Sequence, residues 1–174
     1  TYGGAIYITT TRDELNLEMG HGTQFTLNEA GSGGAIYSND AQIKIGNQAN
    51  FSGNKATAES GGAIYSWDSK NTGSGVVTVG ETATFNQNEA AWSGGAIANF
   101  DGKVSVGQGA QFTSNKALDG NGGAIANNIS GGTVANTQLN IAGNTTFSGN
   151  SVASTSEGYG RGGAIYNAGT LNIY

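Results

Sequence analysis

The sequence contains no cysteine and no proline, and charged residues occupy only 11% of its 174 positions. Without cysteine the chain can form no disulfide, no cysteine-ligated zinc site and no thiol nucleophile. Its 7 Lys and Arg against 12 Asp and Glu give a net charge of −5. An acidic chain argues against nucleic acid as a partner. Because no apolar run approaches the ~18–20 residues of a membrane-spanning helix, we also expect no direct membrane insertion.

Glycine, by contrast, is in excess. It occurs at 31 positions, more than twice its usual share of ~7%. Low charge combined with abundant Gly, Asn, Ser and Thr can indicate disorder, but here the apolar residues are regularly spaced. We therefore expect an ordered chain whose surface is neutral and polar, made largely of amides and hydroxyls.

Three signals recur in the same order along the chain. The string Gly-Gly-Ala-Ile occurs six times, beginning at Gly3, Gly33, Gly61, Gly94, Gly122 and Gly162. An alternating aliphatic pair follows, at Leu15/Leu17, Ile43/Ile45, Val77/Val79, Val104/Val106, Leu139/Ile141 and Leu171/Ile173. Phe-x-x-Asn then occurs five times, at Phe25/Asn28, Phe51/Asn54, Phe85/Asn88, Phe112/Asn115 and Phe147/Asn150. Self-similarity at a spacing of 28–40 residues indicates a repeat protein.

Each repeat predicts three short strands. The alternation of apolar and polar residues, as in 42–45 and 103–106, is typical of half-buried strands. Gly, Asn, Asp and Ser turns separate these stretches, and none has a helical period. The expected fold is an all-β, right-handed parallel β-helix. It is a solenoid of five full three-strand rungs and a partial sixth, forming a single array over residues 1–174.

The rungs of such a fold lie ~4.8 Å apart, so equivalent side chains stack into ladders. We expect an inward ladder of Ile6, Ile36, Ile64, Ile97, Ile125 and Ile165, and another of Phe25, Phe51, Phe85, Phe112 and Phe147. A corner ladder of hydrogen-bonded amides is expected from Asn28, Asn54, Asn88, Asn115 and Asn150. In the Gly-Gly-Ala-Ile strand, Ile is expected to point inward, and Ala and Tyr outward. The Gly pair supplies either a corner with positive φ or room for close packing.

Stacking has two further consequences. Directly after Phe-x-x-Asn, the chain has alternating charges that would align in one column, at Glu29, Lys55, Glu89 and Lys116. Neither end of the sequence shows a polar cap. We therefore expect uncapped ends, and either a segment of a longer exported chain or copies that stack end to end.

The combination of Gly-Gly-Ala-Ile and Phe-x-x-Asn resembles the hallmark of the chlamydial polymorphic outer-membrane proteins. Stretches such as 162–171, Gly-Gly-Ala-Ile-Tyr-Asn-Ala-Gly-Thr-Leu, are also similar to passenger regions of other Gram-negative autotransporter adhesins. The resemblance covers essentially the whole chain. It implies an exported β-helix, displayed at the bacterial surface, that acts in adhesion, self-association or host contact. The absence of cysteine is a departure, because the chlamydial proteins usually carry cysteines.

No arrangement of residues points to catalysis. His21 is the only histidine, and one His without Cys makes no zinc site unless carboxylates converge on it. The sequence has no Gly-x-Ser-x-Gly turn, no calcium-binding Gly-Gly-x-Gly-x-Asp repeat and no phosphate-binding loop. The carboxylates show no recurrence at equivalent offsets on adjacent rungs, apart from the charge column. We therefore expect a protein that is not an enzyme and has no catalytic residue, cofactor or metal.

The best candidates for binding lie in loops. Insertions are expected at 66–75 and 127–133, with a long exit loop at 151–161, and insertions at one corner of a solenoid project from one face. The candidate binding residues are Trp67, Asp68, Lys70, Asn71, Trp92, Tyr159 and Arg161. The alternative is that the two tryptophans fold back onto the solenoid wall.

The sequence thus predicts a structural, adhesive β-helix whose partner is itself, a cell-surface protein or a glycan. The alternative is a carbohydrate-binding or carbohydrate-active β-helix, with the Trp67 loop and nearby acids lining a groove. Two substitutions test the strand assignment. We expect Ile97→Asp to unfold the middle rungs and Asp68→Ala to leave stability nearly unchanged.

Overall fold

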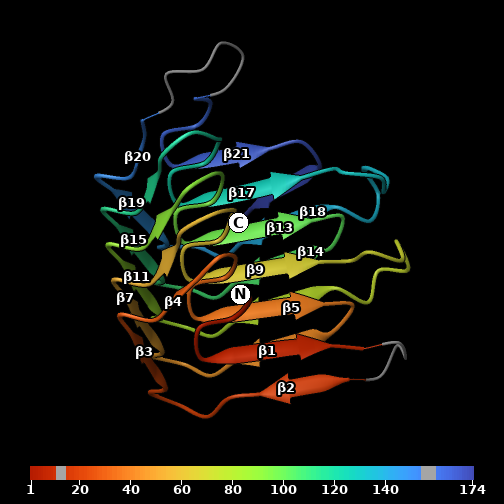
Figure 1. The fold of residues 1–174 in the computed structure, drawn as a ribbon, viewed down its shortest axis with the longest axis horizontal. Helices are drawn as coiled ribbons and strands as arrows, with labels where there is room; N and C mark the ends of the chain where they lie inside the picture. The colour runs from red at the N-terminus through yellow and green to blue at the C-terminus, as the bar shows by residue number, and fades with distance from the viewer. Residues whose placement is uncertain (11–14, 154–159) are drawn as a thin grey trace.

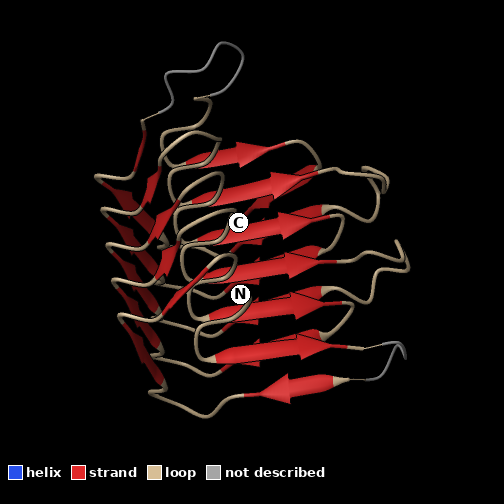
Figure 2. Cartoon of the chain, viewed as in Figure 1, coloured by secondary structure: helices blue, strands red, loops and turns tan. Residues whose placement is uncertain are grey.

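A computed structural model describes residues 1–10, 15–153 and 160–174. These residues form 22 short strands and no helix. The strands wind into a parallel β-solenoid of five full rungs and a partial sixth, as expected (Figures 1 and 2). In the part of the chain that is described, no helix has the length and apolar character to cross a membrane.

Two six-stranded parallel sheets run along the solenoid. The first, here called the tyrosine sheet, comprises β1 (Ile6–Thr9), β5 (Ile36–Asn39), β9 (Ile64–Trp67), β13 (Ile97–Phe100), β17 (Ile125–Asn128) and β21 (Ile165–Asn167). The second, the aliphatic sheet, comprises β2 (Asn16–Glu18), β6 (Gln42–Ile45), β10 (Val76–Val79), β14 (Lys103–Val106), β18 (Gln138–Ile141) and β22 (Thr170–Ile173).

Two five-stranded sheets complete the wall. The phenylalanine sheet comprises β3 (Gln24–Thr26), β7 (Asn50–Ser52), β11 (Thr84–Asn86), β15 (Gln111–Thr113) and β19 (Thr146–Ser148). The short sheet comprises β4 (Glu29–Ala30), β8 (Lys55–Ala56), β12 (Glu89–Ala90), β16 (Lys116–Ala117) and β20 (Ser151–Val152). The expectation of three strands per rung is therefore corrected to four. The additional strand has only two residues, too few to show a period.

The predicted ladders are confirmed. Each Ile of the tyrosine sheet pairs in register with its equivalent on the next rung, and Ile36, Ile64, Ile97 and Ile125 are completely buried. Neighbouring rings of the Phe ladder stack nearly parallel, with centroids 4.7–4.9 Å apart. These ladders and the aliphatic pairs form one continuous core.

The amide ladder of Phe-x-x-Asn is also confirmed, and it is fully hydrogen-bonded. The Oδ1 atom of Asn88 accepts from both the backbone N–H and Nδ2 of Asn54, at 3.0 and 2.9 Å. Its Nδ2 donates to Oδ1 of Asn115 and to the carbonyl oxygen of Phe51, at 2.9 and 3.0 Å. Because every polar atom of this buried side chain has a partner, the corner is stabilised rather than penalised by burial.

The two glycines of Gly-Gly-Ala-Ile have different roles, so both suggested explanations hold. The first has a positive φ in every copy, for example +64° at Gly94, and forms the corner. The second lies against the next rung: a Cβ on Gly95 would overlap the carbonyl oxygen of Gly123. The following Ala was expected to point outward, but Ala96 and its equivalents lie in the core because they occupy the corner before the strand begins.

Candidate functional site

The charge column follows the short sheet. Glu29, Lys55, Glu89 and Lys116 pair in register along β4, β8, β12 and β16. Within this column, Nζ of Lys55 lies 2.8 Å from Oε1 of Glu89. The hydrogen bond and the charge of Glu89 raise the pKa of Lys55. This surface ion pair supports the register and is not a binding site by itself.

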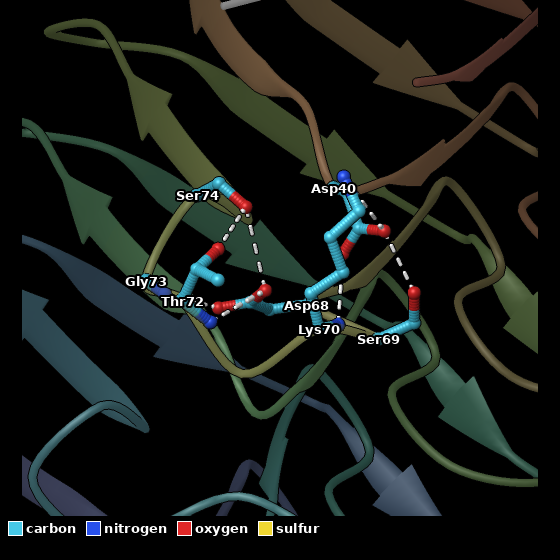
Figure 3. Close-up of polar contacts among 7 residues, drawn as sticks. All are labelled: Asp40, Asp68, Ser69, Lys70, Thr72, Gly73 and Ser74. Carbon is cyan, nitrogen blue, oxygen red and sulfur yellow. Dashed lines mark hydrogen bonds and ion pairs between the residues drawn. The ribbon is translucent and has the colours of Figure 1, made fainter. Parts of the chain in front are cut away.

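The loop of the third rung contains four of the candidate binding residues. Trp67 is the last residue of β9 and pairs in register with Phe100 on the next rung. Asp68 begins the loop and is completely buried. Figure 3 shows the carboxylate of Asp68 enclosed by its own loop. It accepts from the backbone N–H groups of Gly73 and Thr72, at 2.6 and 3.3 Å. Asp68 therefore shapes the loop and is not available to a ligand.

Asp40, one rung earlier, holds the same loop from below. Its carboxylate accepts from Ser69 Oγ at 2.7 Å and from the backbone N–H of Lys70 at 3.2 Å (Figure 3). Nζ of Lys70 lies 4.0 Å from the same carboxylate. Lys70 is thereby drawn toward the wall of the solenoid.

The second insertion is held in an equivalent way by Asp101. Its Oδ1 atom accepts from the backbone N–H groups of Ser130 and Gly132, at 2.8 and 2.9 Å. The two insertions also meet, since Nδ2 of Asn136 donates to the carbonyl oxygen of Asn71 at 3.1 Å. The loops that follow β9 and β17 thus contact one another at the same edge of the solenoid (Figure 1).

These contacts correct the expectation that carboxylates do not recur at equivalent offsets. Asp40, Asp68 and Asp101 each stand seven residues after the first glycine of their Gly-Gly-Ala-Ile string. All three are buried. The signal was present in the sequence, but only in three of the six copies. Among the described residues, no group of three or more His, Cys, Asp or Glu is placed to hold a metal ion.

A groove of about 490 Å³ lies on the outer surface of the tyrosine sheet. One wall is the loops that precede the Gly-Gly-Ala-Ile strings, and the other is the outward side chains of β9, β13 and β17. We call it the Trp92 groove. It is lined by Glu59, Ser60, Tyr65, Trp92, Ser93, Phe100, Asn121 and Asn128.

The groove lies where the column of outward tyrosines is interrupted. Tyr37 and Tyr65 stack with centroids 5.0 Å apart, but Ala98 and Ala126 take the equivalent positions on the next two rungs. Phe100 stacks on Tyr65 at 5.3 Å in place of a fourth tyrosine after Tyr7, Tyr37 and Tyr65. The aromatic residue of β13 therefore stands two positions further along its strand than Tyr65 does on β9, and both line the groove.

Burial shifts the acidity of this column. Burial, followed by the neighbouring Tyr7 and Tyr2, raises the pKa of Tyr37 to about 12. Burial and then Tyr37 raise the pKa of Tyr65 further above its ordinary value. Both phenols are therefore neutral hydroxyls at physiological pH.

The remaining candidate residues are divided by the structure. Trp92 lines the groove and is 42% exposed. Arg161 lies beside the same region, because its backbone N–H donates to Oδ1 of Asn121 at 3.0 Å. Trp67 does not line the groove, and Tyr159 lies outside the described residues. Of the six candidates that are described, Trp92 and Arg161 lie at the groove and the other four in β9 and its loop, although Trp67 pairs in register with Phe100 of the groove.

A second surface is provided by the outward residues of the phenylalanine sheet. On each strand the residues on either side of the buried Phe are uncharged and polar. We call this the amide–hydroxyl face, formed by Gln24, Thr26, Asn50, Ser52, Thr84, Asn86, Gln111, Thr113, Thr146 and Ser148. Its middle rungs are hollowed, and Thr84 Oγ1 donates to Asn50 Oδ1 at 2.9 Å.

The family model of the Chlamydia polymorphic membrane protein repeat matches the chain four times, at residues 22–39, 48–66, 82–99 and 144–168. Every matched stretch runs from a Phe-x-x-Asn motif into the next Gly-Gly-Ala-Ile strand. Together these four stretches cover 80 of the 174 residues, and they are similar to that repeat. No curated protein and no solved structure matched the chain.

The stretch 111–128, which the family model does not match, has the same order of strands as the matched stretches. Its strands β15, β16 and β17 pair in register with the equivalent strands of the matched copy before it. The Trp92 groove spans matched and unmatched copies alike, from Glu59 to Asn128. It is therefore formed by the stacking of successive rungs, and no single rung contains it.

Proposed function

We propose that this chain is a non-catalytic adhesive module displayed at the bacterial surface, where its faces contact a cell-surface protein, a glycan or a second copy of the chain. The observation that carries the proposal is the match of its repeats to the Chlamydia polymorphic membrane protein repeat. Proteins of that family belong to the outer membrane and the cell surface, which supports the same location for this chain.

The architecture supports such a role because it is rigid along its length. The Ile, Phe and Asn ladders each run through at least five rungs without interruption. Each rung is held by its neighbours on both sides. A binding face carried on such a rod keeps its residues in fixed relative positions, which lowers the ordering cost of forming a contact.

The amide–hydroxyl face is the surface that we expect to make the adhesive contact. It offers donors and acceptors at the spacing of the rungs, and none of its ten residues is charged. Such a surface meets a partner through hydrogen bonds and shape, with little salt dependence. Adhesion through this face is therefore expected to persist at high ionic strength.

The test is adhesion of beads coated with the purified chain to epithelial cells. Thr113→Arg and Asn86→Arg place a long cation on the amide–hydroxyl face and should abolish adhesion. The control, Thr78→Arg, makes the same change at an exposed position of the aliphatic sheet and should leave adhesion intact. The proposal would be overturned if beads coated with the folded wild-type chain did not adhere, or if all three variants lost adhesion equally.

The assembly state separates the possible partners. Light scattering and negative-stain microscopy over a concentration series would show filaments if copies of the chain bind one another. Self-association that Thr113→Arg disrupts and Thr78→Arg does not would make a second copy the partner of the amide–hydroxyl face. A monomer at all concentrations would assign that face to a different molecule.

A second candidate, carbohydrate binding, is favoured by the Trp92 groove, which combines aromatic and polar side chains. A carbohydrate-active enzyme is less well supported at this position. Glycoside hydrolysis uses a pair of carboxyl groups on either side of the scissile bond, whereas Glu59 is the single carboxylate that lines the groove.

A further inference from the structure

The Trp92 groove is distinct from the amide–hydroxyl face, and no matched repeat contains all of it. From its geometry we infer that the groove binds a neutral oligosaccharide, with sugar rings resting on Trp92, Tyr65 and Phe100. This inference rests on the second candidate function above, carbohydrate binding by this groove, and names its ligand class; it does not depend on the adhesive contact of the amide–hydroxyl face.

The aromatic residues of the groove provide a surface suited to the C–H faces of a sugar ring. Trp92 is 42% exposed, which is unusual for a tryptophan in a chain with so continuous a core. Phe100 and Tyr65 are already stacked on one another at 5.3 Å, with an interplanar angle of 27°. Their rings are held by the sheet, so little side-chain entropy is lost when a ligand covers them.

The polar residues of the groove match the hydroxyl groups of a sugar. Asn128 is half-buried and lines the groove from the end of β17, and its Nδ2 has no hydrogen-bond partner among the described residues. An amide donor that is buried in a groove without a partner is costly unless a ligand accepts its hydrogen bond. Glu59, Asn121 and the two serines of the lining add further polar groups.

The charge of the groove favours a neutral ligand. Among its eight lining residues there is one carboxylate, Glu59, and no Lys, Arg or His. The whole chain carries a net charge of −5. Anionic ligands such as sialylated or sulfated glycans and nucleic acids would meet repulsion here with no cation among the lining residues to offset it.

The geometry also argues against a peptide at this place. Peptides that bind sheets commonly add as an extra strand at a free edge. The lining strands β9, β13 and β17 are each paired on both sides, so none offers a free edge. Amphipathic helices need a mainly apolar groove, whereas five of the eight lining residues here are polar. The volume of about 490 Å³ lies within the ~300–1,000 Å³ of small-molecule sites.

The test uses saturation-transfer NMR and calorimetry on the purified chain. The probes are neutral di- to tetrasaccharides of glucose, galactose, mannose and N-acetylglucosamine, together with sialylated and sulfated forms. We expect binding of at least one neutral probe and none of the anionic forms. Failure of every neutral probe to bind at millimolar concentration, or preference for an anionic form, would overturn the inference.

Matched variants locate the site. Trp92→Ala should raise Kd at least about tenfold, as expected for removing a central aromatic contact. Asn128→Ala should raise it about three- to tenfold through the loss of one hydrogen bond. Trp67→Ala removes a tryptophan that does not line the groove and should raise Kd less than Trp92→Ala does. Because Trp67 pairs in register with Phe100, a second control is Tyr174→Ala, at an exposed aromatic residue outside the groove. Equal weakening by Trp92→Ala and Tyr174→Ala, with circular dichroism unchanged, would contradict the assignment.

The same variants keep the two proposals apart. Thr113→Arg on the amide–hydroxyl face should retain saccharide binding, and Trp92→Ala should retain adhesion if that contact is made by the amide–hydroxyl face. Ala98→Tyr would restore a tyrosine at the register position above Tyr65 and should block the groove. A folded Ala98→Tyr protein that binds the saccharide as well as the wild type does would overturn the assignment to this groove.

Discussion

The side-chain amide of Asn54 donates from Nδ2 to Oδ1 of Asn88, one rung further along the stack, over 2.9 Å. The same geometry recurs at every Phe-x-x-Asn motif, so the carbonyl and the amine of each central Asn are both used. This chain of amides closes the corner between the phenylalanine sheet and the short sheet. The predictions begin with its loss.

Asn88→Ala should destabilise the solenoid by about 3 kcal/mol, because it leaves both buried donors of Asn54 short of an acceptor and the carbonyl of Phe51 short of a donor. Urea unfolding followed by circular dichroism measures the change. The matched control is Asn28→Ala at the first copy, where the acceptor Asn54 Oδ1 keeps the backbone N–H of residue 28. A cost at Asn88 no larger than at Asn28 would contradict the account.

Gly95→Ala should prevent the middle rungs from stacking. A Cβ at this position would overlap the carbonyl oxygen of Gly123 and the backbone of Lys116, neither of which can move without separating the rungs. We expect loss of the cooperative thermal transition. The control, Gly20→Ala, places a methyl group where no atom lies within 4 Å and should leave stability unchanged or raise it by up to ~1 kcal/mol.

Asp101→Ala should release the loop that connects β17 and β18. The three backbone N–H groups that donate to its carboxylate would lose their acceptor, at a cost of about 1–3 kcal/mol. Limited proteolysis should then cut within 129–137, which the wild type resists. Glu81→Ala, at an exposed carboxylate, serves as the control and should not change the cleavage pattern.

Asp68→Ala is now expected to behave like Asp101→Ala, contrary to the expectation from sequence that it leaves stability unchanged. The reason is that Asp68 is completely buried and its carboxylate bonds to Thr72, Gly73 and Ser74. Chemical denaturation of both variants side by side would test this. A midpoint of Asp68→Ala identical to that of the wild type would restore the earlier expectation.

Stability should fall in alkaline solution through the titration of Tyr37. Its pKa is about 12 in the folded chain and about 10 when unfolded, so the unfolded state loses its proton first. The contribution is therefore complete below pH 10 and is lost as the pH rises toward 12. Urea midpoints across this range measure the slope. Tyr37→Phe, which has no titrating hydroxyl, should show a shallower decline, and an identical slope would contradict the assignment.

The ladders could be predicted because the residues that form them recur in nearly every copy of the repeat. Ile97 and Phe85 each stand at a fixed place in a motif, and a period of one rung is enough to assign them to the core. The two-residue strand Glu89–Ala90 was missed, since alternation over two residues has no meaning. This strand is defined by its pairing with β8 and β16 on the adjacent rungs, and that pairing is known only once the rungs are stacked.

The candidate site was harder to predict for a related reason. Trp92 was identified as a candidate anchor because it is a tryptophan just before the fourth Gly-Gly pair, but its partners in the groove come from other rungs. Phe100 moves beside Tyr65 only because Ala98 leaves room. Such a contact depends on a difference between neighbouring rungs, here Ala98 in place of Tyr65, and a consensus of the repeats does not show that difference.

The in-register pairing of every strand with its counterparts on adjacent rungs has a mechanical consequence. The hydrogen bonds between rungs point along the axis of the rod. A tether that pulls on the two ends of the array therefore loads the bonds of one outermost rung at a time, and they peel in sequence. Each rung released adds roughly 28–40 residues of slack, at up to ~3.3–3.6 Å per residue. Under flow, such a rod would yield in steps, lengthening before its attachment breaks.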